Sequence, residues 1–364
     1  MVVGDTMKAL VTVGDATFKL QDIKIPTLSA HEVLVKVHAV AQNPTDCKTD
    51  ANDTSTVLTQ TKGNLLLHPR VGNILGCDFA GTVVDSNGTG LRNAGDRVAG
   101  VVHGGISPNG AFAEYVAVDA ALLIDIPDDM TFENAAQLGV ACFTVCQSLY
   151  QCLDLPTPLS PTSTPEDILI WSGTSATGQY AVQFAKLAGL RVLSTASAKN
   201  VDFVRSLGAD EVFEYADSRT PKRIVAATGG TLKYAVDCIC EGMTPNQVSM
   251  SLGKDGGTIA TLLPYQSRRK GVKTVFILAY SALGKAVEFP FPFPQSTEHY
   301  ENAKGYCKLI SEVIATGKIK PVPLRLYPNG LASVKDGFED MKTGTVHAEK
   351  ITYRISDTPE LQGQ

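Results

Sequence analysis

The sequence predicts an α/β protein in which an all-β N-terminal domain is followed by a doubly wound parallel sheet. Short alternating segments separated by glycine turns fill residues 7–116, a pattern typical of β-strands. From residue 167 onward, short apolar runs alternate with helical patterns, which indicates strand–helix–strand units. The length of 364 residues also favours two domains over one.

The parallel sheet begins with a strand at Ile168–Ser172, a glycine-flanked turn, and a helix that ends at Gly189. Backbone N–H groups at the start of such a helix, together with the helix dipole, favour a phosphate. We therefore expect the turn to bind a dinucleotide through Gly173, Thr174, Ser175, Ala176, Thr177 and Gly178. Because the middle glycine of the G-x-G-x-x-G fingerprint is missing, a tight turn without a ligand is the alternative.

The second strand, Arg191–Thr195, ends without the acidic residue that selects NAD. Hydroxyl and ammonium groups there would instead bind a 2′-phosphate. The sequence therefore predicts NADPH as the cofactor, with its 2′-phosphate held by Ser197, Lys199 and Asn200. The alternative is that Ser197 only caps the next helix and that Lys199 is solvated.

Composition argues against several kinds of partner. The net charge is −5 and the one basic run is Arg268–Lys270, so nothing favours nucleic acid. No apolar run reaches the ~18 residues of a membrane span, and the N-terminus lacks a signal-peptide pattern. We therefore expect a cytoplasmic protein without membrane contact.

The eight cysteines are expected to be free thiols packed among apolar side chains. Cys142 and Cys146 lie four residues apart in a predicted helix, and Cys238 and Cys240 are expected on one face of a strand. Neither pair has a C-x-x-C partner or a nearby histidine, which argues against zinc.

Two segments outside the nucleotide turn carry further expectations. The helix predicted from Thr131 breaks near Gly139, and Thr144 is expected to open its second half. A strand over residues 273–280 is expected at the sheet edge, and Phe289–Pro294 follows it. Because prolines lack an N–H donor and resist extension of a ladder, we expect a monomer; alternatively, the three phenylalanines form part of a substrate pocket.

Four N-terminal motifs resemble the medium-chain dehydrogenase/reductase superfamily, in its zinc-free quinone-reductase branch. They are N-P-T-D at 43–46 with Lys48 close behind, G-C-D-F-A-G-T-V at 76–83, A-G-D-R-V at 94–98 and G-A-F-A-E-Y at 110–115. The resemblance implies a GroES-like β-domain over residues 1–150, completed by residues 321–364, and a Rossmann domain over residues 151–320.

The zinc alcohol dehydrogenases of that superfamily hold a catalytic metal with a cysteine and a histidine of these loops. By position, Asn43 stands in the cysteine slot and Cys77 in the histidine slot. One thiolate without an imidazole does not make a three-ligand zinc site. We therefore expect no metal, which favours reduction of an activated alkene over oxidation of an alcohol.

The same resemblance suggests which residues surround cofactor and substrate. Lys48 and Thr144 are the expected catalytic residues, as donors to the oxygen on which charge develops. The remaining cofactor-binding residues are expected to be Asn43, Pro44, Tyr215, Leu262, Leu263 and Pro264. The alternatives are that Lys48 is a plain surface lysine and that the Thr144 hydroxyl bonds a carbonyl of its own helix.

Five stretches look most like the fungal trans-acting enoyl reductases. They are S-G-T-S-A-T-G at 172–178, the Pro-rich connector at 155–165, N-P-T-D-C-K at 43–48, A-S-A-K-N at 196–200 and G-A-D-E-V-F-E-Y at 208–215. The resemblance implies NADPH-dependent reduction of α,β-unsaturated acyl thioesters on the acyl-carrier domain of a partner polyketide synthase, or of a synthase–peptide synthetase hybrid. A free-standing NADPH quinone or alkenal reductase and a non-catalytic NADPH-binding scaffold protein remain as alternatives.

Overall fold

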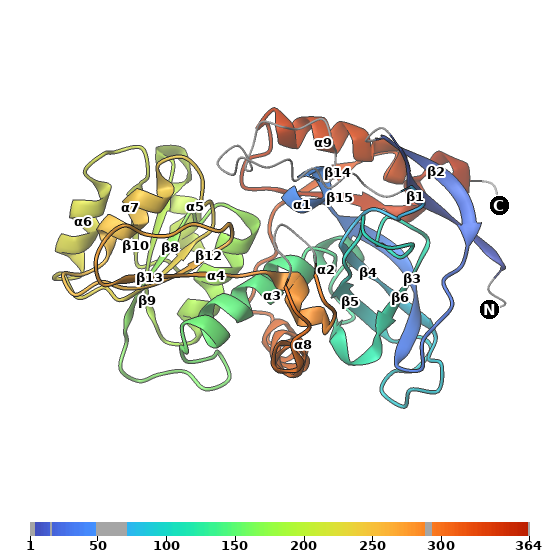
Figure 1. The fold of residues 1–364 in the computed structure, drawn as a ribbon, viewed down its shortest axis with the longest axis horizontal. Helices are drawn as coiled ribbons and strands as arrows, with labels where there is room; N and C mark the ends of the chain where they lie inside the picture. Colours follow the sequence, from blue (N-terminus) through green and yellow to red (C-terminus); the bar gives the residue numbers. More distant parts are fainter. Residues whose placement is uncertain (1–3, 15–16, 49–70, 288–292, 363–364) are drawn as a thin grey trace. The chain divides into compact units, whose positions relative to one another are not determined.

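The computed structural model describes residues 4–14, 17–48, 71–287 and 293–362 (Figure 1). The chain divides into two compact units. The first comprises Met1–Val140, Tyr280–Thr316 and Pro321–Gln364, and the second comprises Ala141–Ala279 and Gly317–Lys320. Among the described residues, no helix has the length and apolar character needed to span a membrane.

The second unit is built on a six-stranded parallel sheet with the order β10-β9-β8-β11-β12-β13. Its strands are β8 (Asp167–Trp171), β9 (Arg191–Ala196), β10 (Glu211–Glu214), β11 (Tyr234–Asp237), β12 (Gly257–Thr261) and β13 (Val272–Phe276). The strand order reverses direction between β8 and β11, which makes this the switch point where ligands bind in such sheets. The predicted doubly wound sheet is confirmed, and its edge strand ends at Phe276, earlier than residue 280.

Helices connect these strands: α4 (Ala176–Leu187), α5 (Val201–Ser206), α6 (Thr220–Ala227) and α7 (Thr244–Ser251). Right-handed crossovers place α4 and α5 on one face of the sheet and α6 and α7 on the other. Helix α4 buries Tyr180 and Phe184 completely. Leu169, Trp171 and Ile259 of the sheet belong to one apolar core.

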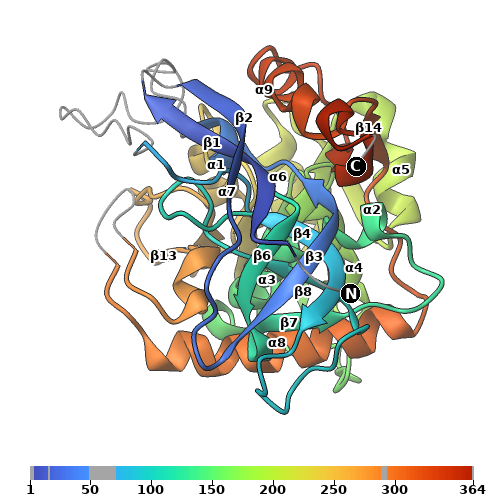
Figure 2. The same ribbon diagram turned by 90° about the vertical axis from the view of Figure 1, so that its right-hand side faces the viewer.

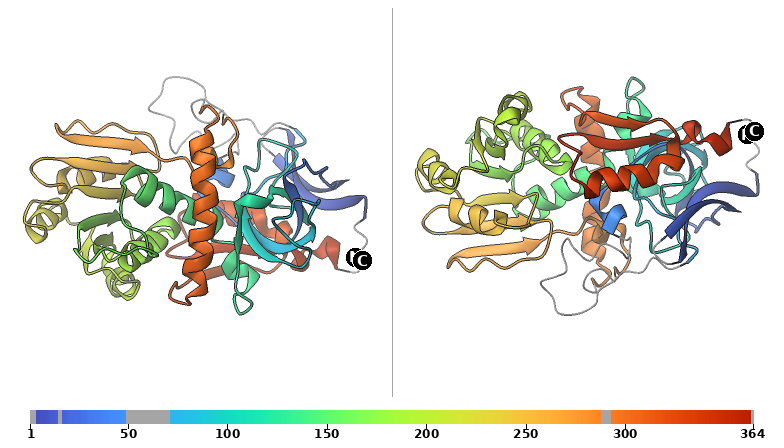
Figure 3. Two further views of the ribbon diagram at one scale, coloured as in Figure 1. Left: turned by 90° about the horizontal axis from the view of Figure 1, so that it is seen from below. Right: turned by 90° about the horizontal axis from the view of Figure 1, so that it is seen from above.

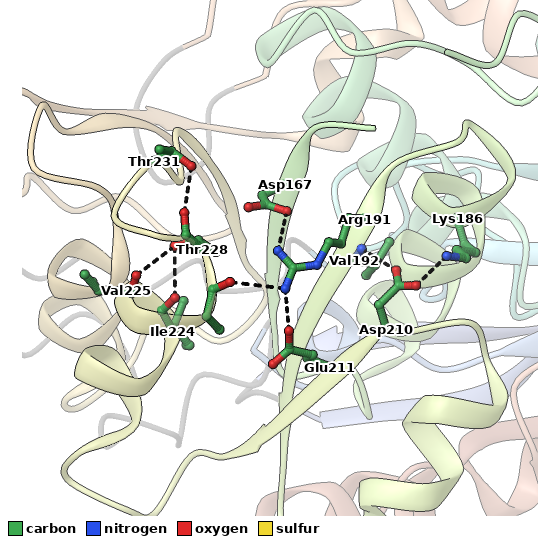
Figure 4. Close-up of polar contacts among 11 residues, drawn as sticks. Asp167, Lys186, Arg191, Val192, Asp210, Glu211, Ile224, Val225, Thr228 and Thr231 are labelled. Atoms are coloured by element: carbon green, nitrogen blue, oxygen red, sulfur yellow. Dashed lines mark hydrogen bonds and ion pairs between the residues drawn. The ribbon is translucent and has the colours of Figure 1, made fainter. Parts of the chain in front are cut away.

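Polar contacts fasten the opposite, amino-terminal edge of this sheet (Figure 4). Arg191 at the start of β9 pairs with Asp167 of β8 at 2.9 Å and with Glu211 of β10. Asp210, just before β10, accepts the Val192 N–H at 2.8 Å. With this edge occupied by internal ion pairs, the carboxyl edge is the one left to bind a ligand.

The first unit holds a seven-stranded sheet in which β14-β15-β3-β4-β5-β7 lie in order and β6 also pairs with β3. The strands are β3 (Glu32–Ala41), β4 (Asp78–Asp85), β5 (Arg97–Val101), β6 (Tyr115–Asp119), β7 (Leu123–Asp125), β14 (Leu324–Tyr327) and β15 (Lys350–Arg354). A separate hairpin joins β1 (Thr6–Gly14) to β2 (Thr17–Lys24). Figure 2 shows β3, β4 and β6 side by side.

Alternation along β3 fixes which side chains enter the core of this unit. Val33, Val35 and Val37 are at most 2% exposed, and they pack in one cluster with Phe79 of β4 and Tyr353 of β15. Because β15 pairs with β3 antiparallel, the C-terminal strand is part of the same sheet as the N-terminal ones. The sheet thereby brings Lys350, at the start of β15, to the end of β3.

Helices complete the two units. They are α1 (Pro44–Lys48), α2 (Phe132–Ala135), α8 (Thr297–Ala315) and α9 (Val334–Lys342) in the first unit, and α3 (Gly139–Cys146), which begins in the first and continues into the second. Helix α8 is the long orange helix of Figure 3. The predicted cap at Thr131 is confirmed, since its Oγ1 accepts the Asn134 N–H at 3.3 Å, and so is the break before Gly139.

Two local predictions were wrong. Thr144 does not open the second helix: it lies in the middle of α3, because Asp78 accepts the Val140 N–H at 2.6 Å and the helix starts at Gly139. Cys238 and Cys240 do not lie on a strand, because β11 ends at Asp237 and Cys240 has a φ of 62°. Of the proline run predicted after the edge strand, residues 289–292 lie outside the described residues.

Candidate active site

The glycine-flanked turn follows β8 directly and leads into α4. A side chain at position 173 would collide with Ser194, and one at position 178 would collide with the carbonyl oxygen of Ser172. Both glycines are therefore needed for the close approach of strand, turn and helix. Ser172 itself has a φ of 69°, a left-handed conformation that non-glycine residues rarely adopt.

Ser175 is the N-cap of α4, and its hydroxyl is used inside the turn. Its Oγ accepts the Gly178 N–H at 3.0 Å and donates to the Ser172 carbonyl at 3.1 Å. Because the Ser175 hydroxyl is already bonded within the turn, the donors available to an anion are backbone N–H groups of the first helical turn. This donor set at the carboxyl edge of β8 fits a dinucleotide pyrophosphate.

The expected 2′-phosphate residues gather at the ends of β9 and β10. Ala196 pairs with Glu214, so the next residues, Ser197 and Tyr215, follow neighbouring strand ends. The Ser197 hydroxyl does not cap the following turn; instead it accepts a hydrogen bond from Asn200 at 3.2 Å. Lys199 is exposed and Tyr215 is 49% exposed. Hydroxyl, amide and ammonium groups on accessible strand ends suit a phosphate.

A buried carboxylate organises the loops that follow β11 and β12. Asp237 accepts the N–H groups of Ile239 at 3.1 Å and Cys240 at 2.9 Å, and the Tyr265 hydroxyl donates to it at 3.2 Å. The Cys240 sulfur accepts the Leu262 N–H at 3.1 Å. These contacts hold the backbone of the expected nicotinamide-binding segment, Leu262, Leu263 and Pro264. Asp237 and Tyr265 have no motif of their own, and sequence reasoning missed them.

In the first unit, three residues form a buried polar network. Lys350 Nζ lies 2.5 Å from Asn43 Oδ1 and 3.5 Å from Asp78 Oδ2. Asn43 Nδ2 donates to Asp78 Oδ2 at 2.8 Å. Burial raises the pKa of the Asp78 carboxyl, and the Lys350 charge partly opposes that rise. The side chains of Lys350 and Asp78 are 5% and 0% exposed, so this is an ion pair held away from water.

These residues do not fit a catalytic zinc. The oxygen of Asn43, the residue in the cysteine slot, accepts from the Lys350 ammonium, so a positive side-chain charge already stands beside it. Cys77, in the histidine slot, keeps its proton because burial raises its pKa well above the ordinary value. Among the residues that the structure describes, no three histidine, cysteine or acidic side chains are grouped to hold a metal.

A second set of polar side chains adjoins this network. The Tyr280 hydroxyl donates to Cys77 Sγ at 3.1 Å and lies 2.8 Å from Thr45 Oγ1. The Cys77 thiol in turn donates to the Asp46 carboxylate. The ring of His103 stacks on that of Tyr280 with centroids 3.9 Å apart. Asp46 lies within the N-P-T-D motif, but sequence reasoning assigned no role to Asp46, Tyr280 or His103.

The two expected catalytic residues belong to different units. Lys48 is the last residue of α1 in the first unit, and Thr144 lies in α3 within the second unit. Thr144 is 6% exposed. Pro44, expected at the cofactor, is the exposed first residue of α1. The structure brings Asn43 together with Asp78 and Lys350, whereas Pro44 makes no part of that network.

The fold and these sites define the class as medium-chain dehydrogenase/reductase. Residues 29–128 match the alcohol dehydrogenase GroES-like domain, and residues 176–273 match the zinc-binding dehydrogenase family. The chain is 37% identical over 358 residues to the trans-enoyl reductase ACTTS2 of Alternaria alternata, covering 96% of this chain and 99% of the relative. It is 35% identical over 361 residues to the trans-enoyl reductase buaC of Petromyces alliaceus, covering 96% and 97%.

The chain therefore belongs to the fungal trans-enoyl reductases of this superfamily, as its motifs predicted. Solved structures share the fold at low identity. The CurK enoyl reductase has a TM-score of 0.75 at 18% identity, and the quinone oxidoreductase of Coxiella burnetii has 0.69 at 24%; each covers 96% of this chain and 99% of that one. Mycobacterial Rv1454c complexed with NADPH has a TM-score of 0.71 at 21% identity, with the same coverage.

Proposed function

We propose that this protein is an NADPH-dependent enoyl reductase that acts in trans on α,β-unsaturated thioesters carried by a polyketide synthase. The observation that supports this most directly is the similarity to trans-enoyl reductases, which are 35% and 37% identical to this chain over 96% of its length. The Lys350–Asn43 contact supports it independently, because a site without metal ligands favours alkene reduction over alcohol oxidation.

NADPH is the proposed cofactor, with its pyrophosphate at Gly173–Gly178 and its 2′-phosphate at Ser197, Lys199 and Asn200. The absence of an acidic residue among 194–199 supports NADPH over NADH, because a carboxylate there would repel the added phosphate. Tyr215 would pack beside the adenosine, and Leu262–Pro264 would line the nicotinamide. A bound dihydronicotinamide supplies a hydride for the β-carbon of the enoyl chain.

Hydride addition leaves negative charge on the thioester oxygen as an enolate. A donor aimed at that oxygen stabilises the transition state, typically by about 3 kcal/mol for one good hydrogen bond. We assign this role to Lys48 and Thr144. The α-carbon then takes a proton, which completes the saturated thioester.

Parallel assays with crotonyl-pantetheine and a 1,4-quinone, each with NADPH and NADH, test this function. We expect crotonyl-pantetheine to be reduced with NADPH at a kcat/KM at least about tenfold above that with NADH, which corresponds to ~1.4 kcal/mol of discrimination. Transfer of the crotonyl chain to the carrier domain of a polyketide synthase should raise kcat/KM further. Reduction of the quinone alone would instead make this a free-standing quinone reductase, and NADPH binding without any turnover would make it a scaffold.

A further inference from the structure

Four side chains of the first unit form one continuous hydrogen-bonded row, Thr45–Tyr280–Cys77–Asp46. Tyr280, Cys77 and Asp46 are at most 3% exposed, whereas Thr45 is only half-buried. The Asp46 carboxyl is therefore at the buried end of the row, and Thr45 is at its more exposed end. Water cannot easily replace its three inner members.

Every member of the row can both donate and accept a hydrogen bond when Asp46 carries a proton. Tyr280 donates to Cys77, and Cys77 donates to Asp46, so the row as observed points toward the carboxylate. With a proton on Asp46, the same contacts can reverse and point toward Thr45. A row that can hold a proton at either end can carry one along its length.

We propose that Thr45 donates the proton that completes alkene reduction and that Tyr280, Cys77 and Asp46 form the relay that restores it. The proposal rests on the proposed enoyl reduction. Cys77 stands in the slot that holds a metal ligand in the zinc-dependent members of the superfamily, so one member of the row occupies a position that those members use for their chemistry. Here a buried proton chain takes the place of a metal-bound group.

The step balances without a further reagent. The enolate electron pair forms the new C–H bond at the α-carbon while the Thr45 O–H bond breaks. Thr45 Oγ1 then takes the Tyr280 proton, Tyr280 takes the Cys77 proton, and Cys77 takes the Asp46 proton. After the product leaves, a proton from solvent enters at Thr45, the more exposed end of the row, and passes back along the row to the Asp46 carboxylate before the next turnover. The two electrons that reduce the alkene come from the nicotinamide hydride, so the relay moves protons only.

The surroundings of Asp46 support its role as the proton store. Burial raises the pKa of Asp46 to about 7, so both protonation states are populated near neutral pH. The titratable and charged groups that face it include Cys77, Tyr280, Asp78 of β4 and Lys350 of β15. Asp78 raises its pKa and Lys350 lowers it. The Asn43 backbone N–H donates to Asp46 Oδ2 at 2.7 Å and fixes the carboxyl in place.

Two matched pairs of variants test the relay: Cys77→Ala against Cys77→Ser, and Thr45→Val against Thr45→Ser. Tyr280→Phe is tested together with Cys77→Ala and Thr45→Val, because it also interrupts the row: it removes the hydroxyl but keeps the ring that stacks on His103. Reduction of crotonyl-pantetheine by NADPH in D₂O then reports kcat, KM and the configuration of the new α-deuterated carbon.

We expect Cys77→Ala, Thr45→Val and Tyr280→Phe to lower kcat at least about tenfold, since positioned proton transfer usually contributes a hundredfold or more. KM and NADPH affinity should stay near the wild-type values. These three variants should also lose control of the α-configuration, because water then protonates either face. Cys77→Ser and Thr45→Ser should keep most of the turnover and one configuration, since a hydroxyl can still carry the proton.

Cys307→Ala is the control, because it removes a buried thiol from α8 of the same unit, outside the row. It should leave the configuration unchanged. Equal losses in Cys77→Ala and Cys77→Ser would overturn the relay, as would a single α-configuration in Tyr280→Phe. The rate of the wild-type protein tests the proposed function separately. If the wild type reduced no enoyl thioester, both the proposed function and the relay would be overturned.

Discussion

Lys350 and Asn43, 307 residues apart in the sequence, meet at 2.5 Å inside the first unit. The antiparallel pairing of β15 with β3 brings them together. The contact puts a fixed ammonium beside the residue that stands in a metal-ligand slot, with Asp78 as its counter-charge. A charge pair of this kind is costly to break, because either partner alone would be a buried charge without compensation.

Replacing Lys350 with methionine should therefore lower the free energy of unfolding by about 3–5 kcal/mol, the usual result of removing one partner from a buried pair. Urea unfolding measures the loss. Adding Asp78→Asn to Lys350→Met should recover part of it, because the second change removes the uncompensated carboxylate. If the double variant were less stable than the single one, the network would matter for its hydrogen bonds rather than its charges.

Asp46 should make the protein less stable as pH rises. Its folded-state pKa is about 7, against an ordinary pKa of 3.8 for an exposed aspartate, so the folded protein holds this proton at pH values where the unfolded chain has lost it. The stabilisation is present below pH 4 and is lost as pH rises to 7, by about 2–4 kcal/mol at 1.36 kcal/mol per pKa unit. Urea unfolding of wild type and Asp46→Asn at pH 5 and pH 8 measures this loss.

The stability difference between the two proteins should then change with pH, in the direction that favours Asp46→Asn at pH 8. Asp22→Asn is the control, because Asp22 is an exposed carboxylate paired with Lys8. It should show no such trend. A pH-independent difference between wild type and Asp46→Asn would mean that Asp46 stays ionised in the folded protein.

Asp237 should position the nicotinamide end of the cofactor without affecting the adenosine end. We expect Asp237→Asn to weaken NADPH binding by about tenfold, or ~1.4 kcal/mol, because it disturbs the loops that hold Leu262. The dissociation constant of 2′-phospho-ADP-ribose, which lacks nicotinamide, should differ by less than about twofold between Asp237→Asn and wild type. Fluorescence quenching of Trp171 or calorimetry measures both affinities. Equal weakening of the two ligands would show a general loss of the fold.

Ser197 should set the choice between NADPH and NADH. Ser197→Asp adds a negative charge at the end of β9, where it would repel a 2′-phosphate and accept from a ribose hydroxyl. We expect the ratio of kcat/KM for NADPH over NADH to fall at least about tenfold, or ~1.4 kcal/mol. Ser197→Ala is the matched variant without charge and should shift the ratio less. An unchanged ratio in Ser197→Asp would place the 2′-phosphate elsewhere.

Lys48→Ala should lower turnover at least about tenfold while NADPH affinity stays nearly unchanged, as expected for a donor that acts on the developing oxyanion. Lys48→Arg keeps the charge and should retain part of the rate. Steady-state kinetics with crotonyl-pantetheine separates kcat from KM. A fully active Lys48→Ala enzyme would make this residue a surface lysine without a catalytic role.

Local patterns predicted the elements of this fold well. The strand–turn–helix at residues 168–189, the cap at Thr131 and the break at Gly139 follow from nearby residues, and all three are present. The strand that begins at Tyr234 was predicted to be too long. It ends at Asp237, because the Asp237 carboxylate accepts the N–H groups of Ile239 and Cys240. Thr144 was misplaced within its helix because Asp78, 62 residues before Val140, fixes where that helix begins.

The sequence by itself determined the family, the parallel sheet and the turn that can hold a phosphate, because periodicity and short motifs depend on neighbours along the chain. Only the tertiary structure showed what stands in the metal-ligand slots. Lys350 contacts Asn43, and Tyr280 contacts Cys77; each lies more than 200 residues away along the chain from the residue it contacts. Their contacts arise from strand pairing and burial, and only the folded chain brings those residues together.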